Sequence, residues 1–528
     1  MGLFLEVVIY AVNILLQYIA AIWQTLLSGG IASILLFALG SAWIFYCIKK
    51  DKADKLLAPF IVFNLGCAIT WGIFAGIAHD EAEHLHCVWM VSKGLVPYRD
   101  FWQHHLPMMW AFLSIPFRWI KPTAYIFLVS RLFCALLFAC TAAVAWMIAK
   151  KVWGNRAYLP IFILVILSDN FFSNFIELRP LCFMIFFILL GIYFCMRIPE
   201  DKLRWPLLAG AAISFGLTFD FREVIFITLP AIFILLEDRR WILRRLSVCI
   251  AGMIIGSLPF LFYITKNHIV ADLFYWAIAL NFYKAKLSLG PILVRVAAGL
   301  TAGWFLVRAI YYKAKGSKAS VVLWVAILYS MLFSLTLVYI QRYFLTLCFI
   351  LFAIFLSGFS GSDMLRIIKL DNIKKSIAIG LIMTIALIPG VQTIRSPRLF
   401  KDTAIISKLL KISANQQCIT LAPYHPIFAY DAIGIYTTWQ FLFLQGGTRS
   451  TKFVASKNVT NQVIDLKPAV IAYGAGEREL FELIKYLKIV TDEEYDKIES
   501  FLKEEYSVKD LGGERFYIRN DLLKEAGL

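Results

Sequence analysis

The sequence predicts an all-α polytopic membrane protein with about 13 transmembrane helices and a small α/β extracytoplasmic domain at its C-terminal end. Two bulk observations predict the membrane class. Of the 528 residues, 60% are hydrophobic and 16% are charged, whereas soluble domains are roughly 45–50% apolar and about 25% charged. The net charge is +17, but the excess Lys and Arg residues lie in short loops between apolar segments. That pattern is typical of a membrane protein and argues against nucleic acid as a partner.

About 13 apolar segments are candidates to cross a bilayer, each crossing requiring about 20 residues. They lie near residues 5–22, 30–48, 57–78, 124–148, 157–173, 180–197, 206–219, 223–236, 247–265, 290–312, 320–340, 343–359 and 376–394. The region 206–236 is too long for one ordinary helix, and both of its flanks are basic. We therefore expect a hairpin of two short helices there, with its turn at Asp220, Phe221, Arg222 and Glu223.

The basic connections between these segments alternate along the chain and predict its topology. They are residues 49–55, 150–156, 197–204, 237–245, 311–318 and 366–375. Basic loops favour the cytoplasmic side, so we expect the N-terminus inside and the C-terminal end outside. Two aromatic outer segments, Met108–Ile120 and Val270–Leu289, are too short or too charged to cross. Both are typical of helices that lie along the membrane surface.

The composition changes after about residue 396, where charges of both signs appear and apolar spans end. Strands are expected at 418–423, 468–474 and 515–520, and helices at Gly476–Val490 and Asp492–Tyr506, the second with Thr491 or Asp492 as its cap. These elements predict a small α/β domain outside the membrane.

Polar chemistry is concentrated in the segment His79–Pro107, which we expect to be an outer loop. It contains five of the seven histidines and the acidic residues Asp80, Glu81 and Asp100. Asp80 and Glu81 directly follow the apolar segment 57–78, so their carboxylates would be held at a fixed depth near the membrane boundary. A carboxylate placed in this way can act as a general base, an effect worth roughly 10²–10⁴ in rate.

Three arginines flank apolar segments on the same outer side: Arg179, Arg222 and Arg342. Arginine binds phosphate through paired, charge-assisted hydrogen bonds, and ionisable residues within membrane segments are candidates for function. A carboxylate base together with outer arginines is typical of glycosyl transfer from a lipid-phosphate sugar. The alternative for Arg179 and Arg222 is simple pairing with the neighbouring Glu177 and Glu223.

The loop also carries a family resemblance. Asp80-Glu81, the run Gly94–Phe101 (GLVPYRDF) and His105-Leu106-Pro107 resemble the first outer loop of the membrane GT-C glycosyltransferases. The nearest groups are bacterial relatives of the protein O-mannosyltransferases and of the lipid A aminoarabinose transferases. Gln341-Arg342-Tyr343 and the short outer α/β tail are similar as well. The family often has His-Pro-Pro where this chain has His105-Leu106-Pro107, so the local turn departs from the family pattern.

The resemblance implies a function and a division of the chain. It implies an inverting transferase in a bacterial inner membrane, which takes a sugar from a polyprenyl-phosphate donor on the outer face and passes it to a lipid, glycan or protein acceptor. Residues 1–56 would be an additional hairpin with a basic loop, 57–395 the catalytic membrane domain with its active-site loop at 79–122, and 396–528 the outer domain. The expected catalytic residues are Asp80 as base, Glu81 and Asp100; the expected substrate-binding residues are Arg342, Arg222, Arg179, His105, Tyr98 and His104.

Three alternatives remain open at this point. One is a non-enzymatic assembly subunit that keeps the scaffold without catalysis, although the presence of both Asp80 and Arg342 argues against it. His84, His86, His104 and His105 could meet around a divalent metal ion, although adjacent histidines seldom bind one ion and imidazoles readily hydrogen-bond carboxylates. We therefore assign no certain cofactor and no metal ligands, and leave a divalent metal open. A transporter or flippase of lipid-linked sugars or other solutes would also be polytopic. The two halves of the chain, however, show no internal hydropathy repeat of the kind that many transporters have.

Overall fold

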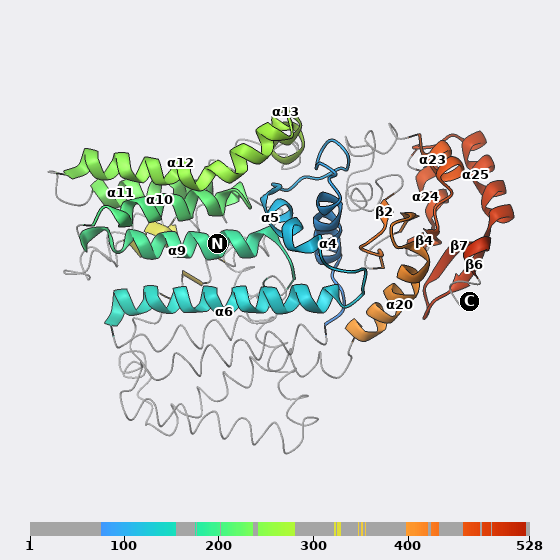
Figure 1. Ribbon diagram of the computed structural model, residues 1–528, viewed down its shortest axis with the longest axis horizontal. Coiled ribbons are helices and arrows are strands. Elements are labelled where there is room, and N and C mark those ends of the chain that lie inside the picture. Colours follow the sequence, from blue (N-terminus) through green and yellow to red (C-terminus); the bar gives the residue numbers. More distant parts are fainter. Residues whose placement is uncertain are drawn as a thin grey trace, which may run out of the picture.

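The computed structural model describes most of the region between residues 75 and 279 and of the region from 398 to 523 (Figure 1). The described ranges, which have single-residue gaps at 176 and 487, are 75–154, 175–200, 202–235, 241–279, 398–420, 424–431, 458–475 and 478–523, with a few positions between 322 and 354. The described residues do not include Arg342 or the expected spans at 5–22, 30–48, 157–173, 290–312 and 376–394. They also leave out most of the expected spans at 57–78, 320–340 and 343–359.

Among the described residues, four apolar helices lie side by side and form a bundle (Figure 1). They are α6 (Ile126–Trp153), α9 (Pro180–Cys195), α10 (Arg204–Leu217) and α12 (Ile242–Lys266). Helix α9 packs between α6 and α10, and α10 packs between α9 and α12. The helices expected at 124–148, 180–197 and 247–265 are therefore confirmed as helices. Among the described residues, α6 and α12 are long and apolar enough to cross a membrane.

The region 206–236 contains the expected break. Helix α10 ends at Leu217, and a 3₁₀ segment, η4 (Phe221–Thr228), leads into the short helix α11 (Leu229–Leu235). The chain turns through Thr218–Asp220, where the buried Asp220 interrupts the apolar run. Two helical pieces on either side of Asp220 agree with the hairpin predicted from the basic flanks.

Glycines allow α10 and α12 to approach closely. A methyl group added at Gly252 would lie 2.1 Å from the carbonyl oxygen of Leu207, and one at Gly256 would lie 2.3 Å from that of Ala211. Gly210 makes the reciprocal approach, 2.3 Å from the carbonyl of Cys249. Small residues at such a crossing are the usual basis of helix packing in membranes, since they bring two backbones into van der Waals contact.

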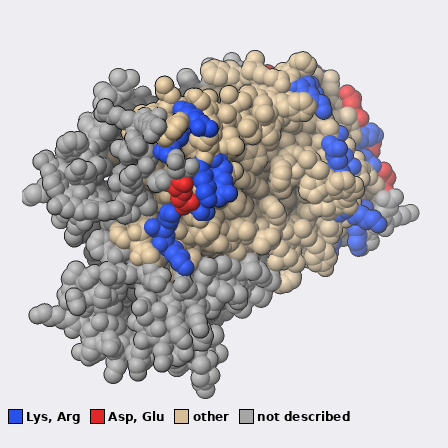
Figure 2. Space-filling model, turned by 60° about the vertical axis from the view of Figure 1, so that its left-hand side comes forward, with Lys and Arg blue, Asp and Glu red and all other residues tan. Residues whose placement is uncertain are grey.

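A group of charged side chains lies at one end of this bundle. Figure 2 shows a group of Lys and Arg side chains around an acidic patch, next to a broad surface without charged side chains. At this end Glu200 accepts hydrogen bonds from Lys151 at 2.9 Å and from Arg197 at 2.9 Å, which ties the end of α6 to the end of α9. These residues belong to the basic connections predicted at 150–156 and 197–204; their position relative to a membrane stays a prediction.

At the opposite end of the bundle lie α4 (His79–Ser92) and α5 (Met108–Phe117), joined by the loop 93–107 (Figure 1). The expectation of a loop from residue 79 was wrong for its first half, because His79–Ser92 is helical. Residues 81–91 of α4 are all buried, so each polar group there has to find a partner inside the protein. The interfacial helix expected at Met108–Ile120 corresponds to α5, and that expected at Val270–Leu289 begins as α13 (Val270–Leu273) and a π-helical turn (Phe274–Ala279).

The C-terminal region contains a five-stranded sheet in the order β2-β1-β3-β7-β6. The strands are β1 (Gln417–Ile419), β2 (Tyr430–Asp431), β3 (Val470–Ala472), β6 (Tyr506–Asp510) and β7 (Arg515–Arg519), and β4 (Gly474–Ala475) and β5 (Arg478–Glu479) form a separate pair. Strand β1 pairs in parallel with β2 and β3, while β7 is antiparallel to β3 and β6. The helices are α20 (Arg398–Ser413), α23 (Val459–Leu466), α24 (Leu480–Tyr486) and α25 (Asp492–Glu505).

The expected strands at 418–423, 468–474 and 515–520 coincide with β1, β3 and β7, whereas β2, β5 and β6 were not expected. The helix expected at Gly476–Val490 begins only at Leu480, as α24, because Arg478–Glu479 forms strand β5. Helix α25 begins with a capping box, in which Thr491 and Glu494 exchange side-chain and backbone hydrogen bonds. The alternative cap, Asp492, is the first residue of the helix. Strand β6 follows α25 directly, so the helix predicted to end at Tyr506 ends one residue earlier.

We expect Gly252→Leu to destabilise the protein, because the new side chain would meet the backbone of Leu207. Overpacking of this kind typically costs about 1–3 kcal/mol. Thermal unfolding of the purified protein in detergent measures the effect. The matched control is Ala251→Leu, an exposed position on the same helix; equal losses in the two variants would contradict the proposed close approach.

Candidate functional site

Helix α4 is fixed at its N-terminus by a buried ion pair between Glu81 and Arg131 of α6. The two side chains are 0% and 1% exposed, and Arg131 Nη2 lies 2.7 Å from Glu81 Oε2. Arg131 Nε donates to both Glu81 oxygens at 2.8 and 3.1 Å, and Nη1 and Nη2 donate to the carbonyl oxygens of Ala75 and Gly76 at 2.7 Å each. Both charges are thus paired, which a buried ion pair requires.

Asp80, the neighbouring residue, takes part in a second and more open network. Its Oδ2 accepts a hydrogen bond from Nη1 of Arg179, and the same guanidinium donates from Nη2 and, at 2.7 Å, from Nε to Oε2 of Glu177. The Asp80 side chain is 26% exposed, and those of Arg179 and Glu177 are 12% and 8% exposed. Asp80 is therefore paired and still reachable from solvent, in contrast to Glu81.

Arg179 lies directly before α9, where Pro180 occupies the first helical turn, so its position depends on the start of that helix. Burial raises the pKa of Glu177, while the Arg179 guanidinium opposes this shift. The sequence left open whether Arg179 simply pairs with Glu177. The structure shows that it pairs with Glu177 and Asp80 together and so links α4 to α9.

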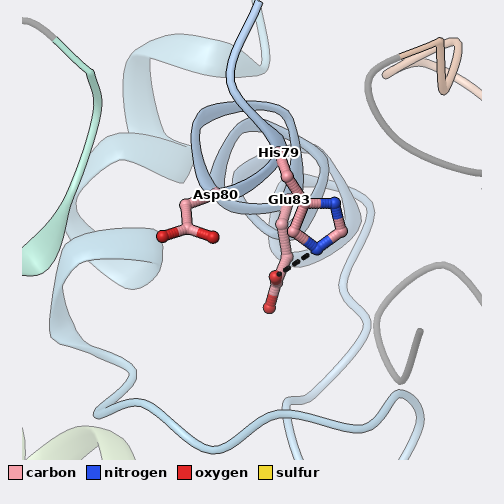
Figure 3. Close-up of side chains that lie close together, drawn as sticks. All are labelled: His79, Asp80 and Glu83. Atoms are coloured by element: carbon pink, nitrogen blue, oxygen red, sulfur yellow. Dashed lines mark ion pairs between the residues drawn. The ribbon is translucent and has the colours of Figure 1, made fainter. Parts of the chain in front are cut away.

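Three side chains at the start of α4 form a group of potential metal ligands (Figure 3). Donor atoms of His79, Asp80 and Glu83 lie within 4.8 Å of one another, and His79 Nε2 is 3.5 Å from Glu83 Oε2. Burial lowers the pKa of His79, which favours the neutral imidazole that a metal ion requires. Glu83 Oε1 also accepts a hydrogen bond at 2.5 Å from Nε2 of Gln103, in the loop that follows α4.

The loop 93–107 is folded back on itself around Tyr98. This residue has a left-handed backbone (φ 68°), is buried, and its hydroxyl donates a hydrogen bond to the carbonyl oxygen of His105 at 2.5 Å. Asp100 Oδ2 accepts from the backbone N–H of Val96 at 2.7 Å, and Asp100 pairs with Arg99 at 3.0 Å. These contacts hold the shape of the loop.

The histidines of this region divide into two groups. His84 accepts a hydrogen bond from Nε1 of Trp110 at 3.3 Å, and its ring centroid lies 5.0 Å from that of His105, which in turn is 4.0 Å from His104. Burial, followed by the charge of His105, lowers the pKa of His84 well below its usual value. His86 contacts His425 and does not join this group. The four histidines that could have bound one metal ion, namely His84, His86, His104 and His105, therefore do not form one cluster.

His86 instead contacts the C-terminal region. Its Nδ1 lies 3.0 Å from Nε2 of His425 and 3.2 Å from the carbonyl oxygen of Ile427, and His425 Nδ1 is hydrogen-bonded to the hydroxyl of Thr420. Burial lowers the pKa of His86 to about 4, which the carbonyl of Ile427 opposes, and burial also lowers that of His425. Two neutral imidazoles thus join α4 to the segment between β1 and β2.

Of the residues predicted for the site, Asp80 and Arg179 are brought into contact, and Glu81 is adjacent but paired separately. His104 and His105 contact each other, and Tyr98 supports their loop. Arg222 lies in η4 and its side chain, like the whole of Arg342, is outside what the structure describes.

Four further residues of the site were not predicted from the sequence: Arg131, Glu83, Gln103 and His425. Only Arg131 had a usable signal, since a lone cation in the apolar run 124–148 is a candidate for function.

The fold is shared with a solved polytopic membrane protein of the group that the sequence resembles. A solved structure that shares it is the crystal structure of ArnT from Cupriavidus metallidurans in the apo state. It matches with a TM-score of 0.54 and 12% sequence identity, over 89% of this chain and 98% of that chain. ArnT is a lipid A aminoarabinose transferase. At this identity the likeness establishes the polytopic fold. No protein-family model and no curated protein matches the chain.

We expect Arg131→Met to lower the free energy of unfolding by about 3–5 kcal/mol, because the substitution leaves the buried Glu81 carboxylate without its cation. The double variant Glu81→Met/Arg131→Met should lose less than the sum of the single losses. Unfolding in detergent measures both. Lys151→Met, which breaks the exposed pair with Glu200, is the control and should cost about 0–1 kcal/mol. A loss for Arg131→Met as small as that of the control would argue against the buried pair.

We also expect the stability to fall as the pH is lowered from about 6.5 to about 4. Since His86 has a folded pKa of about 4 and an unfolded value of about 6.5, the unfolded chain binds the proton first and is favoured in this window. The loss for His86 alone is on the order of 3 kcal/mol. His86→Gln should show a shallower pH dependence than the wild type in detergent unfolding. The control is Ser247→Ala, an exposed substitution that removes no titratable group and should keep the wild-type slope.

Proposed function

We propose that the protein is a membrane glycosyltransferase that moves a sugar from a polyprenyl-phosphate donor to an acceptor on the outer face of the membrane. The observation that carries the proposal is the position of Asp80. In a GT-C fold, this carboxylate stands at the first turn of α4, partly exposed and aligned by Arg179. Its neighbour Glu81 anchors the same turn to α6 through Arg131.

Asp80 is the proposed general base. Its contact with the Arg179 guanidinium favours the ionised carboxylate, which can accept the proton of an acceptor hydroxyl or amine. The acceptor oxygen or nitrogen then forms a bond to the anomeric carbon, and the bond from that carbon to the donor phosphate breaks. Attack from the face opposite the leaving group gives inversion. Proton transfer to a positioned base is worth roughly 10²–10⁴ in rate.

Glu81 and Arg179 are better assigned as positioning residues. Both oxygens of Glu81 accept hydrogen bonds from Arg131 in a fully buried setting, so we propose that this carboxylate fixes the helix and does not touch substrate. Arg179 is held by Asp80 on one side and Glu177 on the other. We propose that it orients Asp80, although the sequence alone suggested that it binds phosphate.

The charges around Asp80 also bear on where the donor phosphate binds. Among the described residues, the ion pairs at the start of α4 contain the carboxylates of Asp80, Glu81 and Glu177 and the guanidiniums of Arg131 and Arg179. This set carries no surplus positive charge, whereas a leaving polyprenyl phosphate needs cationic stabilisation. We therefore propose that Arg342, together with Arg222, binds the donor phosphate. Asp100, Tyr98, His104 and His105 would shape the adjacent loop.

The residues around Asp80 would also fit a divalent cation as an auxiliary group. His79, Asp80 and Glu83 offer one imidazole and two carboxylates, a donor set that suits zinc or manganese. If such an ion binds, it would supply charge next to Asp80, and His79 and Glu83 would hold it.

The test measures sugar transfer by the purified chain from a radiolabelled polyprenyl-phosphate sugar to a membrane-extract acceptor. We expect Asp80→Asn to reduce the rate by roughly 10²–10⁴, because the amide cannot accept the proton. Asp272→Asn, which neutralises another carboxylate at the same end of the bundle, is the control and should retain the wild-type rate. Equal rates for wild type and Asp80→Asn would remove Asp80 as the base.

The same preparation discriminates the alternative class. If the labelled donor is never consumed by the wild type, and the protein in proteoliposomes moves a solute or lipid-linked sugar across the bilayer, the function is transport and the proposal of glycosyl transfer is wrong.

A further inference from the structure

A second site lies at the other end of α4, away from Asp80. A cavity of about 130 Å³ opens between the last turn of α4, the end of α5 and the C-terminal residues Asn415 and Phe428. Since a helix rises about 1.5 Å per residue, Ser92 at this cavity lies about 18 Å along the axis from Asp80. One water occupies about 30 Å³, so the cavity has room for a small anionic group such as a phosphate.

The polar lining of the cavity is cationic. Lys93 and Arg118 both line it, and no acidic residue does. Among the residues that the structure describes, neither side chain forms an ion pair with a carboxylate; Lys93 Nζ lies 5.8 Å from the centroid of the Trp89 ring. Ser92 and Asn415 add a hydroxyl and an amide to the lining. Two cations without carboxylate partners at one concave site are the arrangement that binds phosphate.

The other walls of the cavity are aromatic and fixed in place. Phe117 at the end of α5 stacks on Phe428, with ring centroids 5.6 Å apart and an interplanar angle of 25°. Trp89 packs edge-on against Phe428 at 6.5 Å. All three rings are buried. The cavity is therefore built from two distant parts of the sequence, and its apolar walls suit a ligand in which a phosphate adjoins apolar material.

The surface beside the cavity is apolar and aromatic. Trp119, between the lining residues Arg118 and Ile120, is 77% exposed, and Tyr125, which follows the lining residue Pro122, is 69% exposed. Phe112 and Ile115 of α5 are exposed as well. Tyr125 directly precedes α6, which is long and apolar enough to span a membrane. Exposed Trp and Tyr residues at the end of such a helix are typical of the headgroup level of a bilayer.

We propose that this cavity binds the phosphate of an anionic membrane lipid, held by Lys93 and Arg118, with the acyl chains along the exposed aromatic surface of α5 and the start of α6. The proposal goes beyond the transfer reaction, because it concerns a site at the far end of α4 and holds whether or not the protein transfers sugar. Bound lipid would join α4, α5 and the segment at Asn415, and so would couple the C-terminal region to the membrane surface.

Native mass spectrometry of the full chain in detergent tests the proposal with three probes: short-chain phosphatidylglycerol, short-chain phosphatidylcholine and inorganic phosphate. We expect the wild type to bind phosphatidylglycerol about tenfold more tightly than phosphatidylcholine, because two charge-assisted contacts favour the anionic lipid. Lys93→Gln/Arg118→Gln should abolish this preference. Lys121→Gln/Lys408→Gln, which removes two exposed cations that do not line the cavity, should keep it.

Three outcomes would overturn the proposal. They are a preference that survives in Lys93→Gln/Arg118→Gln, an equal loss in the control variant, and binding of inorganic phosphate as tight as that of phosphatidylglycerol. The last result would indicate a site for a soluble anion. Thermal unfolding checks that both variants are folded; if the double variant is not, Arg118→Gln alone should reduce the preference by about threefold.

Discussion

The buried pair of Glu81 and Arg131 is the constraint on which the site depends. Its two charges are removed from water almost completely, which is costly unless every donor and acceptor is satisfied. Arg131 meets this condition by also donating to the carbonyls of Ala75 and Gly76, the residues that lead into α4. The Arg131 guanidinium thereby fixes both the first turn of α4 and the residues that precede this helix. Asp80 is held in place because it is adjacent to Glu81 in the same turn.

Adjacent residues on a helix point about 100° apart, and this separation gives Asp80 and Glu81 different environments. Glu81 faces α6 and is sealed by Arg131, whereas Asp80 faces the start of α9, where Arg179 and Glu177 leave it partly exposed. A fully buried, paired carboxylate can stabilise the packing of a helix. A partly exposed carboxylate can exchange a proton with solvent or with a substrate. The sequence shows Asp80 and Glu81 as two equivalent acidic residues, whereas the structure gives them different roles. Glu81 fixes the helix through Arg131, and Asp80 is the candidate general base.

The sequence predicted the parts of the fold that depend on local pattern. The apolar helices α6, α9 and α12, the break at Asp220 and the cap at Thr491 all follow from neighbouring residues. Helix α4 could not be predicted in this way, because the polar run HDEAEHLH is stable as a buried helix only when distant groups satisfy it. Those groups belong to Arg131, Gln103 and His425. The residues near α4 in the sequence do not predict these contacts. The pairing of Asp80 with Arg179, 99 residues away, is equally non-local, although both residues had been singled out as candidates.

The contact between His86 and His425 spans 339 residues of sequence, and this separation has a consequence for biosynthesis. At about 5–20 residues per second, the ribosome completes α4 roughly 20–70 s before His425 is synthesised. During that interval the face of α4 that carries His86 and Trp89 lacks its permanent cover, since Phe428 and Tyr430 also arrive late. The acidic helix of the site is therefore among the first elements to leave the ribosome and among the last to be enclosed. A chain that stops before residue 425 would carry the carboxylates of the site without the packing that holds them in register.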